Sequence, residues 1–169
     1  MTAAVNNPAA VIPAPIGCLE AERGVLGGLL CLPALEAQVA TDNMVSDDFT
    51  DPRHGVIFES VAELTAAGTP ADPITVSGHL RRTGQERCFT SDRAPAVYLF
   101  DLLDALPSVG NLGYYMRIVV EHSARRRARE ASVRVGHAAE LEDLDTARQV
   151  AVAELMSVLD AFDRIEAAS

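Results

Sequence analysis

The sequence predicts an all-α protein in which a globular multi-helix head is followed by a long antiparallel helical hairpin. Its 169 residues are 49% hydrophobic but only 5% aromatic, without tryptophan and with abundant alanine and leucine. This composition favours helices over sheets. Apolar residues also recur at helical spacing along most of the chain. In the last third, two adjacent helical stretches have opposite charge.

The predicted hairpin lies between residues 111 and 165. Its first arm, 117–134, has six arginines against two glutamates, and its second arm, 140–166, has eight carboxylates against two arginines. In the second arm, one seam of residues repeats at alternating steps of four and three, the pattern of a coiled-coil face. The seam, which we predict to be a self-association or partner interface, consists of Leu144, Arg148, Ala151, Leu155, Val158, Phe162 and Ile165.

Burial, rather than charge, is expected to stabilise this hairpin. Exposed ion pairs contribute roughly 0–1 kcal/mol each, whereas burying Leu155, Val158 and Phe162 contributes roughly 1.5–3 kcal/mol apiece. Charge then selects the pairing of the arms. Two helices leave an outer face uncovered, and that face requires either the head or another chain.

The overall charge argues against a protein that mainly grips nucleic acid. The net charge is −10, and phosphate backbones are bound by clustered lysine and arginine. All fourteen basic residues are arginines, so a P-loop lysine and a Schiff-base lysine are excluded. One local basic contact patch is possible, as an alternative to a solvated face beside the acidic arm: Arg125, Arg126, Arg127 and Arg129.

The cysteines and the N-terminus indicate a reduced, cytoplasmic protein. Cys18, Cys31 and Cys88 form no CxxC pair, so neither a disulfide framework nor a zinc site is predicted. Residues 1–17 have three prolines and no basic residue, which predicts a disordered N-terminal arm rather than a signal peptide. The apolar run at 25–32 is too short to span a bilayer.

The head is predicted to occupy residues 18–112. Its first helix, 19–32, places Glu20 and Glu22 in the first turn and ends at Pro33, and a short helix follows at 34–40. The pair Gly27 and Gly28 weakens a helix, so we expect a neighbouring helix to approach closely there.

Three further helices complete the head before the hairpin at 113–169. They span 53–67, 74–82 and 94–106, and the region 85–93 between the last two is expected to be a loop. Gly68, Gly84 and Pro107 provide the stop signals. Ser108 or Asn111 can then cap the next helix, whose first turns suit the core of the head and which leaves it near His122.

Five groups of residues, in one order across 19–165, together form a recognisable pattern. They are Ala21-Glu22 with Val25-Leu26-Gly27-Gly28-Leu29-Leu30; Asp48-Phe49 with Pro52-Arg53-His54 and Ile57-Phe58; Gly68-Thr69-Pro70-Ala71-Asp72 with Thr75-Val76; Tyr98-Leu99 with Leu102; and Pro107-Ser108 with Asn111, Tyr114-Tyr115 and Ile118-Val119. This pattern resembles the N-terminal domain of the DnaB-type replicative helicases.

The resemblance implies a helical head and a hairpin that pairs between subunits in a dimer or a ring. It also implies a collar at which primase and helicase loaders dock. ATP, Mg²⁺ and DNA translocation would belong to a separate motor domain that the chain, ending at Ser169, does not include. The chain departs from the family pattern where Arg93-Ala94-Pro95-Ala96 replaces a common Gly-Gly pair, so the path of 85–96 is expected to differ.

No catalytic, cofactor or metal site is predicted. His54 beside Asp51 and Arg53 is more simply a structural histidine at a helix start, and the other histidines lack the spacing of metal ligands. Tyr114 and Tyr115 have the spacing of a buried face rather than of a base-stacking platform. We therefore expect a non-catalytic assembly and docking domain that contacts DNA only indirectly, the alternative being a nucleic-acid-binding module that acts through the arginine patch.

Overall fold

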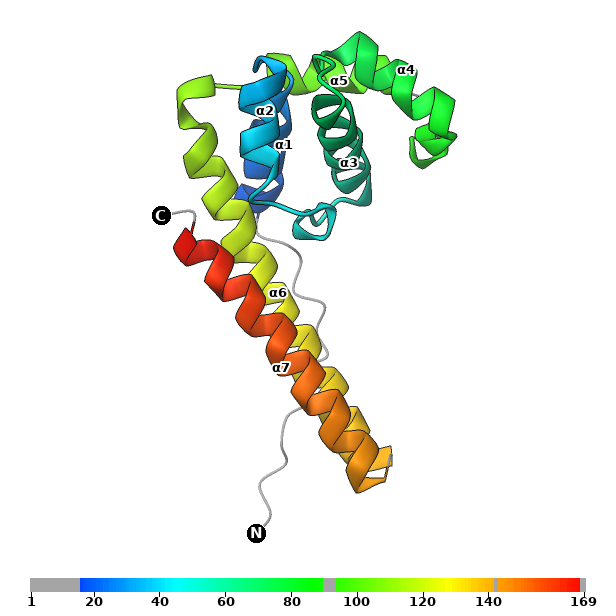
Figure 1. The fold of residues 1–169 in the computed structure, drawn as a ribbon, viewed down its shortest axis with the longest axis vertical. Helices are drawn as coiled ribbons and strands as arrows, with labels where there is room; N and C mark the ends of the chain where they lie inside the picture. Colours follow the sequence, from blue (N-terminus) through cyan, green and yellow to red (C-terminus); the bar gives the residue numbers. More distant parts are fainter. Residues whose placement is uncertain (1–15, 90–93, 142, 168–169) are drawn as a thin grey trace.

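The computed structural model describes residues 16–89, 94–141 and 143–167, and every regular element in this part of the chain is a helix (Figure 1). The all-α fold class is confirmed. Residues 1–15 of the predicted N-terminal arm (1–17) lie outside the described residues. The α-helices are α1 (Ile16–Leu29), α2 (Ala34–Thr41), α3 (Pro52–Ala66), α4 (Pro73–Thr83), α5 (Pro95–Asp104), α6 (Leu112–Leu141) and α7 (Leu144–Ala167), and the 3-10 helices are η1 (Ser46–Asp48), η2 (Gln85–Cys88) and η3 (Val109–Asn111).

Local signals in the sequence set the ends of α3 and α4. Asp51 accepts a hydrogen bond from the backbone N–H of Arg53 at 2.9 Å, and Asp72 accepts from those of Ile74 and Thr75 at 2.7 and 2.9 Å. A proline follows each capping residue. Gly68 and Gly84, with φ of 72° and 73°, have the left-handed conformation that ends a helix at low cost.

The connections before and after α5 differ in detail from the predictions. The region 85–93, expected to be a loop, contains η2, and its residues 90–93 lie outside the described residues. Ser108 caps the short helix η3, where its Oγ accepts from the N–H of Gly110 at 3.2 Å, rather than α6 itself.

Helix α1 lies at the centre of the head. Its Val25, Leu26 and Leu29 are buried. A Cβ at Gly27 would come within 2.5 Å of the Leu102 carbonyl oxygen, and one at Gly28 within 2.9 Å of a methyl carbon of Leu112. The glycine pair therefore permits the close approach of α5 and α6 that the sequence predicted. The rest of the core comes chiefly from Ile57, Phe58, Val61, Val76, Leu80, Leu99 and Leu102.

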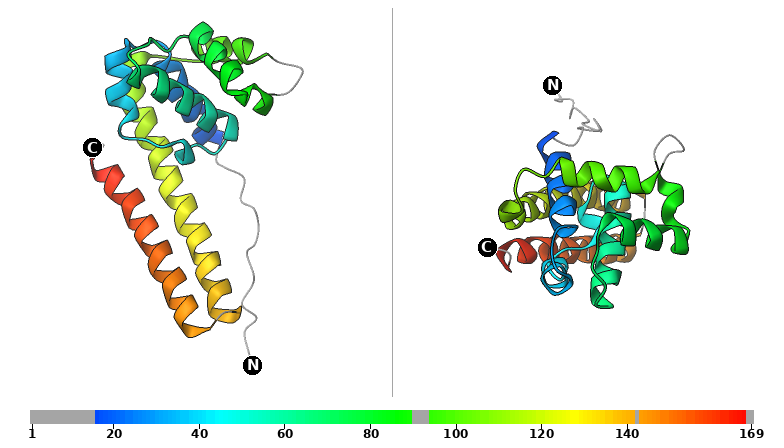
Figure 2. Two further views of the ribbon diagram at one scale, coloured as in Figure 1. Left: turned by 45° about the vertical axis from the view of Figure 1, so that its right-hand side comes forward. Right: turned by 90° about the horizontal axis from the view of Figure 1, so that it is seen from above.

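Helix α6 belongs to both halves of the molecule. Leu112, Val119 and Val120 complete the head core, and the same helix then continues outward and pairs with α7 (Figures 1 and 2). It runs unbroken across the predicted boundary between residues 112 and 113, and that division of the chain remains a prediction. None of the helices in the described part is both long and apolar enough to cross a membrane.

Small side chains fill the space between the two arms of the hairpin. Ala124, Ala131 and Ala138, seven residues apart on α6, are buried, as is Ala161 on α7. Small residues let two helices lie close together. α7 therefore turns its alanine-containing face inward and leaves bulkier side chains outside.

The prediction that Leu155 and Phe162 are buried between the arms is wrong. Their exposed fractions are 60% and 45%, whereas Val158 is half-buried. Among the ion pairs of the described residues, the one that joins the arms is that of Arg134 with Glu154, at 2.5 and 2.7 Å. The opposite charges of the arms therefore meet chiefly at one point.

Candidate functional site

Helix α7 exposes a row of large apolar side chains, here called the α7 ridge. Its members are 45–60% exposed: Val152, Leu155, Met156, Leu159 and Phe162. Steps of three and four residues place them along one side of the helix. Contiguous apolar surface of this kind marks interaction sites on monomers, so the α7 ridge is the main candidate for a contact surface.

The ridge overlaps the interface predicted from the sequence without coinciding with it. Leu144, Arg148, Leu155 and Phe162 are exposed, Ala151 and Val158 are half-buried, and the side chain of Ile165 lies outside the described residues. Val152, Met156 and Leu159 were missed. Each directly follows a residue of the predicted seam. The exposed face of α7 is therefore rotated by about one residue from the predicted face, because α7 turns its alanine-containing face toward α6.

The arginine patch is divided by the structure. Arg126 donates to Thr50 Oγ1 at 3.0 Å and to the carbonyl of Asp47, and Arg127 donates to Ser123 Oγ at 3.3 Å. Arg125 and Arg129 are exposed, and Arg125 lies 3.5 Å from Glu121. Arg127 Nη2 also lies 3.5 Å from Asp48, so two of the four guanidinium groups face the head, which does not favour a single nucleic-acid surface.

Asp48 lies at the joint between the head and the hairpin. This fully buried carboxylate accepts two hydrogen bonds from Arg164 of α7, at 2.7 and 3.1 Å. It also accepts from Ser123 Oγ at 2.8 Å and from the N–H of Val45 at 2.9 Å, and it lies 3.5 Å from Arg127. A buried charge requires such partners, and these partners connect η1, α6 and α7.

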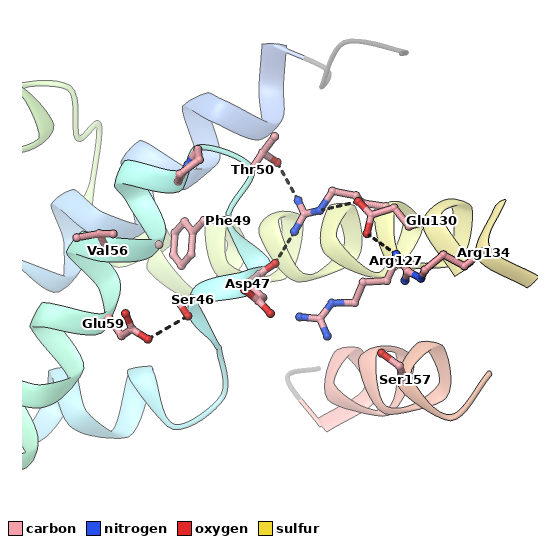
Figure 3. A pocket seen from close by; sticks show the side chains of 13 residues that line it. Ser46, Asp47, Phe49, Thr50, Val56, Glu59, Arg127, Glu130, Arg134 and Ser157 are labelled. Atoms are coloured by element: carbon pink, nitrogen blue, oxygen red, sulfur yellow. Dashed lines mark hydrogen bonds and ion pairs between the residues drawn. The ribbon is translucent and has the colours of Figure 1, made fainter. Parts of the chain in front are cut away.

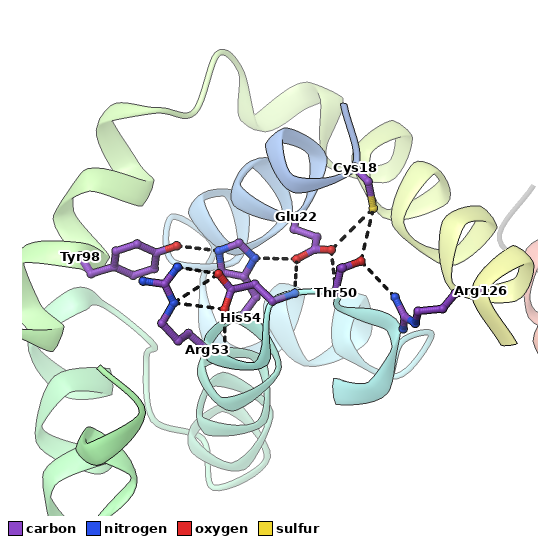
Figure 4. Close-up of polar contacts among 8 residues, drawn as sticks. Cys18, Glu22, Thr50, Arg53, His54, Tyr98 and Arg126 are labelled. Atoms are coloured by element: carbon purple, nitrogen blue, oxygen red, sulfur yellow. Dashed lines mark hydrogen bonds and ion pairs between the residues drawn. The ribbon is translucent and has the colours of Figure 1, made fainter. Parts of the chain in front are cut away.

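A second buried polar network crosses the head (Figure 4). His54 Nε2 lies 2.7 Å from Tyr98 Oη, and His54 Nδ1 lies 2.6 Å from Glu22 Oε2. The N–H of Thr50 donates to Glu22 Oε1 at 2.7 Å, and Thr50 in turn binds Arg126. The network therefore joins α5, α3, α1 and α6.

Burial and hydrogen bonding set the protonation of this network. Burial alone would raise the pKa of Glu22, but hydrogen bonds from His54 and from the backbone of Thr50 outweigh it and lower that pKa. An ionised carboxylate only accepts hydrogen bonds, so His54 Nδ1 bears the hydrogen. Burial, together with the charge of Glu22, raises the pKa of Cys18 to about 11.

The sequence did not predict the position of Glu22. It was expected in the first turn of a helix at 19–32, but α1 spans Ile16–Leu29, so Glu22 lies in the middle of the helix, where it is fully buried. The expected structural role of His54 agrees with its 2% exposure.

A cleft of about 590 Å³ separates the head from the hairpin beside the joint (Figure 3). Phe49 and Val56 line it from the head, and Arg126, Arg127 and Arg134 line it from α6. Nη2 of Arg127 is buried without a hydrogen bond. Beside the cleft, Arg126 donates hydrogen bonds to Thr50 Oγ1 and to the carbonyl of Asp47, and these bonds join α6 to the head. Among the described residues, no group of three His, Cys, Asp or Glu side chains could hold a metal ion.

Comparison with known proteins identifies the family. The model of the DnaB-like helicase N-terminal domain matches residues 15–121. This chain belongs to that family. The DnaB assignment made from the sequence is confirmed.

Relatives and a solved structure agree with the DnaB assignment. The replicative DNA helicase DnaB of Leifsonia xyli subsp. xyli is 36% identical over 143 residues, which are 83% of this chain and 30% of that protein. That of Mycobacterium leprae is 38% identical over 117 residues, 69% of this chain and 18% of that protein. The crystal structure of the N-terminal domain of DnaB helicase from Mycobacterium tuberculosis has a TM-score of 0.73 and 33% identity, covering 83% of this chain and 96% of that one. The chain thus spans less than a third of either helicase.

Proposed function

We propose that this domain assembles and docks a replicative helicase, and that the α7 ridge is the surface through which it self-associates. The observation that supports this most is the exposure of five large apolar side chains along one side of a projecting helix. The names of its relatives, replicative DNA helicases, give this surface a biological setting.

The size of the ridge indicates how strong the association can be. Fully burying a large apolar side chain contributes roughly 1.5–3 kcal/mol, and the ridge side chains are already about half covered in the single chain. The ridge would then contribute on the order of 5 kcal/mol from each chain. Association itself costs roughly 4–15 kcal/mol, so we expect self-association that depends on concentration.

Light scattering during size exclusion tests this proposal with a matched pair of variants. Leu155→Glu places a charge on the ridge, whereas Leu35→Glu changes a leucine on α2 that is even more exposed, at 73% against 60%. We expect Leu155→Glu to raise the dissociation constant at least tenfold and Leu35→Glu to leave it unchanged. Equal effects, or a wild-type chain that stays monomeric at high micromolar concentration, would disprove the role of the ridge.

The domain would act without chemistry of its own. ATP and Mg²⁺ would belong to a motor domain, as the family resemblance implies. DNA would be contacted only indirectly, because Arg126 already bonds to Thr50 and Asp47 of the head and Arg127 lies 3.5 Å from Asp48. Its three cysteines are free thiols, which fits a reducing, cytoplasmic setting.

Docking of primase or a helicase loader would use the surface of the head. Val97 and Phe100 on α5 are 51% and 49% exposed and offer an apolar patch for such a partner. Phe100→Glu should then weaken binding of primase measured by biolayer interferometry while leaving the mass in solution unchanged. Unchanged binding would exclude this face of α5.

A further inference from the structure

Two kinds of contact hold α7 in place. Along its length α7 packs on α6, where Ala161 is fully buried and Glu154 pairs with Arg134. Near its C-terminal end, Arg164 donates two hydrogen bonds to Asp48 in the head, at 2.7 and 3.1 Å. Among the described side chains near the end of the hairpin, Arg164 therefore fastens α7 to the head.

The two partners in this contact depend on it unequally. Asp48 is fully buried and keeps Ser123, Arg127 and the N–H of Val45 as partners when Arg164 leaves. The Arg164 side chain is 26% exposed, so water can solvate it once it is released. Most buried ion pairs are hard to break because opening them leaves a buried charge without a partner. Opening the contact between Arg164 and Asp48 leaves no such charge.

We propose that Arg164 and Asp48 form a releasable clasp that holds the last turns of α7 against the head. α6 cannot release in the same way, because it is continuous with the core of the head through Val119 and Val120. When the clasp opens, the C-terminal part of α7 separates from the head while α6 and the head stay in place.

The clasp also controls one end of the α7 ridge. Phe162 lies two residues before Arg164 on the same helix, so the position of its ring depends on whether the clasp is closed. A partner, or a second chain, that contacts Phe162 would distinguish the closed from the open state. The clasp lies within one chain, however, and does not depend on self-association.

Hydrogen exchange measured by mass spectrometry tests the clasp in Arg164→Gln. We expect amides at 158–164 to exchange about tenfold faster, since that factor corresponds to a lost charge-assisted hydrogen bond. Amides at 146–154 and in the head should be unchanged. Arg148→Gln, which removes an exposed arginine of the same helix, is the matched control and should alter neither region.

Two further variants make the result decisive. Arg164→Lys keeps the charge but loses the two-pronged geometry, and should give an intermediate effect. Making the Arg164 variants in a chain that also has Leu155→Glu removes the protection from exchange that arises from self-association. The test of the clasp then does not depend on the proposed ridge contact. Exchange at 158–164 in Arg164→Gln equal to that in Arg148→Gln would overturn the clasp, as would an equal rise throughout the head.

Discussion

Removing the imidazole of His54 should destabilise the head strongly. The ring is 2% exposed and lies 2.6 Å from Glu22 Oε2 and 2.7 Å from Tyr98 Oη. His54→Ala removes a hydrogen-bond partner from both Glu22 and Tyr98 and leaves a cavity. Leaving a buried carboxylate such as that of Glu22 without its partner costs about 3–5 kcal/mol. Because this is a large share of the stability of an average domain, about 5–15 kcal/mol, the variant should remain folded only marginally.

Urea unfolding followed by circular dichroism measures this effect. For a loss of about 3–5 kcal/mol and m-values of about 1–3 kcal/mol/M, the midpoint should fall by roughly 1–5 M. His137→Ala, at an exposed position of α6, is the control and should shift the midpoint little. A loss below about 1 kcal/mol in His54→Ala, with an unchanged m-value, would refute the argument that the buried Glu22 carboxylate depends on His54.

Three other predictions follow from single features. Folding lowers the pKa of Glu22, so its stabilising contribution is complete above the unfolded value of about 4.3 and is lost as pH falls towards the folded-state pKa; Glu22→Gln should flatten the acid side of the unfolding free energy, and an unchanged slope would contradict this. Gly27→Ala should destabilise by about 1–3 kcal/mol because its Cβ meets the backbone of α5, whereas Gly78→Ala, with open space in α4, should stabilise by up to about 1 kcal/mol; urea unfolding giving the same sign for both would contradict this. The thiol of Cys18, whose pKa is raised to about 11, should react with iodoacetamide at pH 8 far more slowly than the exposed Cys31, as peptide mass spectrometry would show, and equal rates would argue against its burial.

Local signals in the sequence were sufficient for most of the head. Asp72 with Pro73 at the start of α4, and Gly84 at its end, define that helix because capping involves residues only a few positions apart. The paired glycines of α1 predicted a close neighbour for a similarly local reason. Glycine weakens a helix, and the absence of a Cβ lets another helix approach the backbone closely.

Contacts between distant residues were not predictable in the same way. Glu22 and His54 are 32 positions apart, and Asp48 and Arg164 are 116 positions apart. Each of these residues is, by itself, an ordinary polar residue of the sequence. The predicted seam on α7 differs from the exposed ridge for another reason. Apolar periodicity identifies an amphipathic helix but not which partner its apolar face contacts. Here the buried alanines of α6 pack against the face of α7 that has the smaller side chains.

Isotope-filtered nuclear Overhauser measurements can detect self-association through the α7 ridge itself. Mixing ¹³C-methyl-labelled and unlabelled chains at high micromolar concentration should give intermolecular contacts at the methyl groups of Leu155 and Leu159. In Leu155→Glu, the intermolecular contacts at the methyl groups of Leu159 should disappear. Intermolecular contacts confined to the head, or none at a concentration where light scattering detects more than one chain per particle, would contradict the assignment of the α7 ridge as the self-association surface.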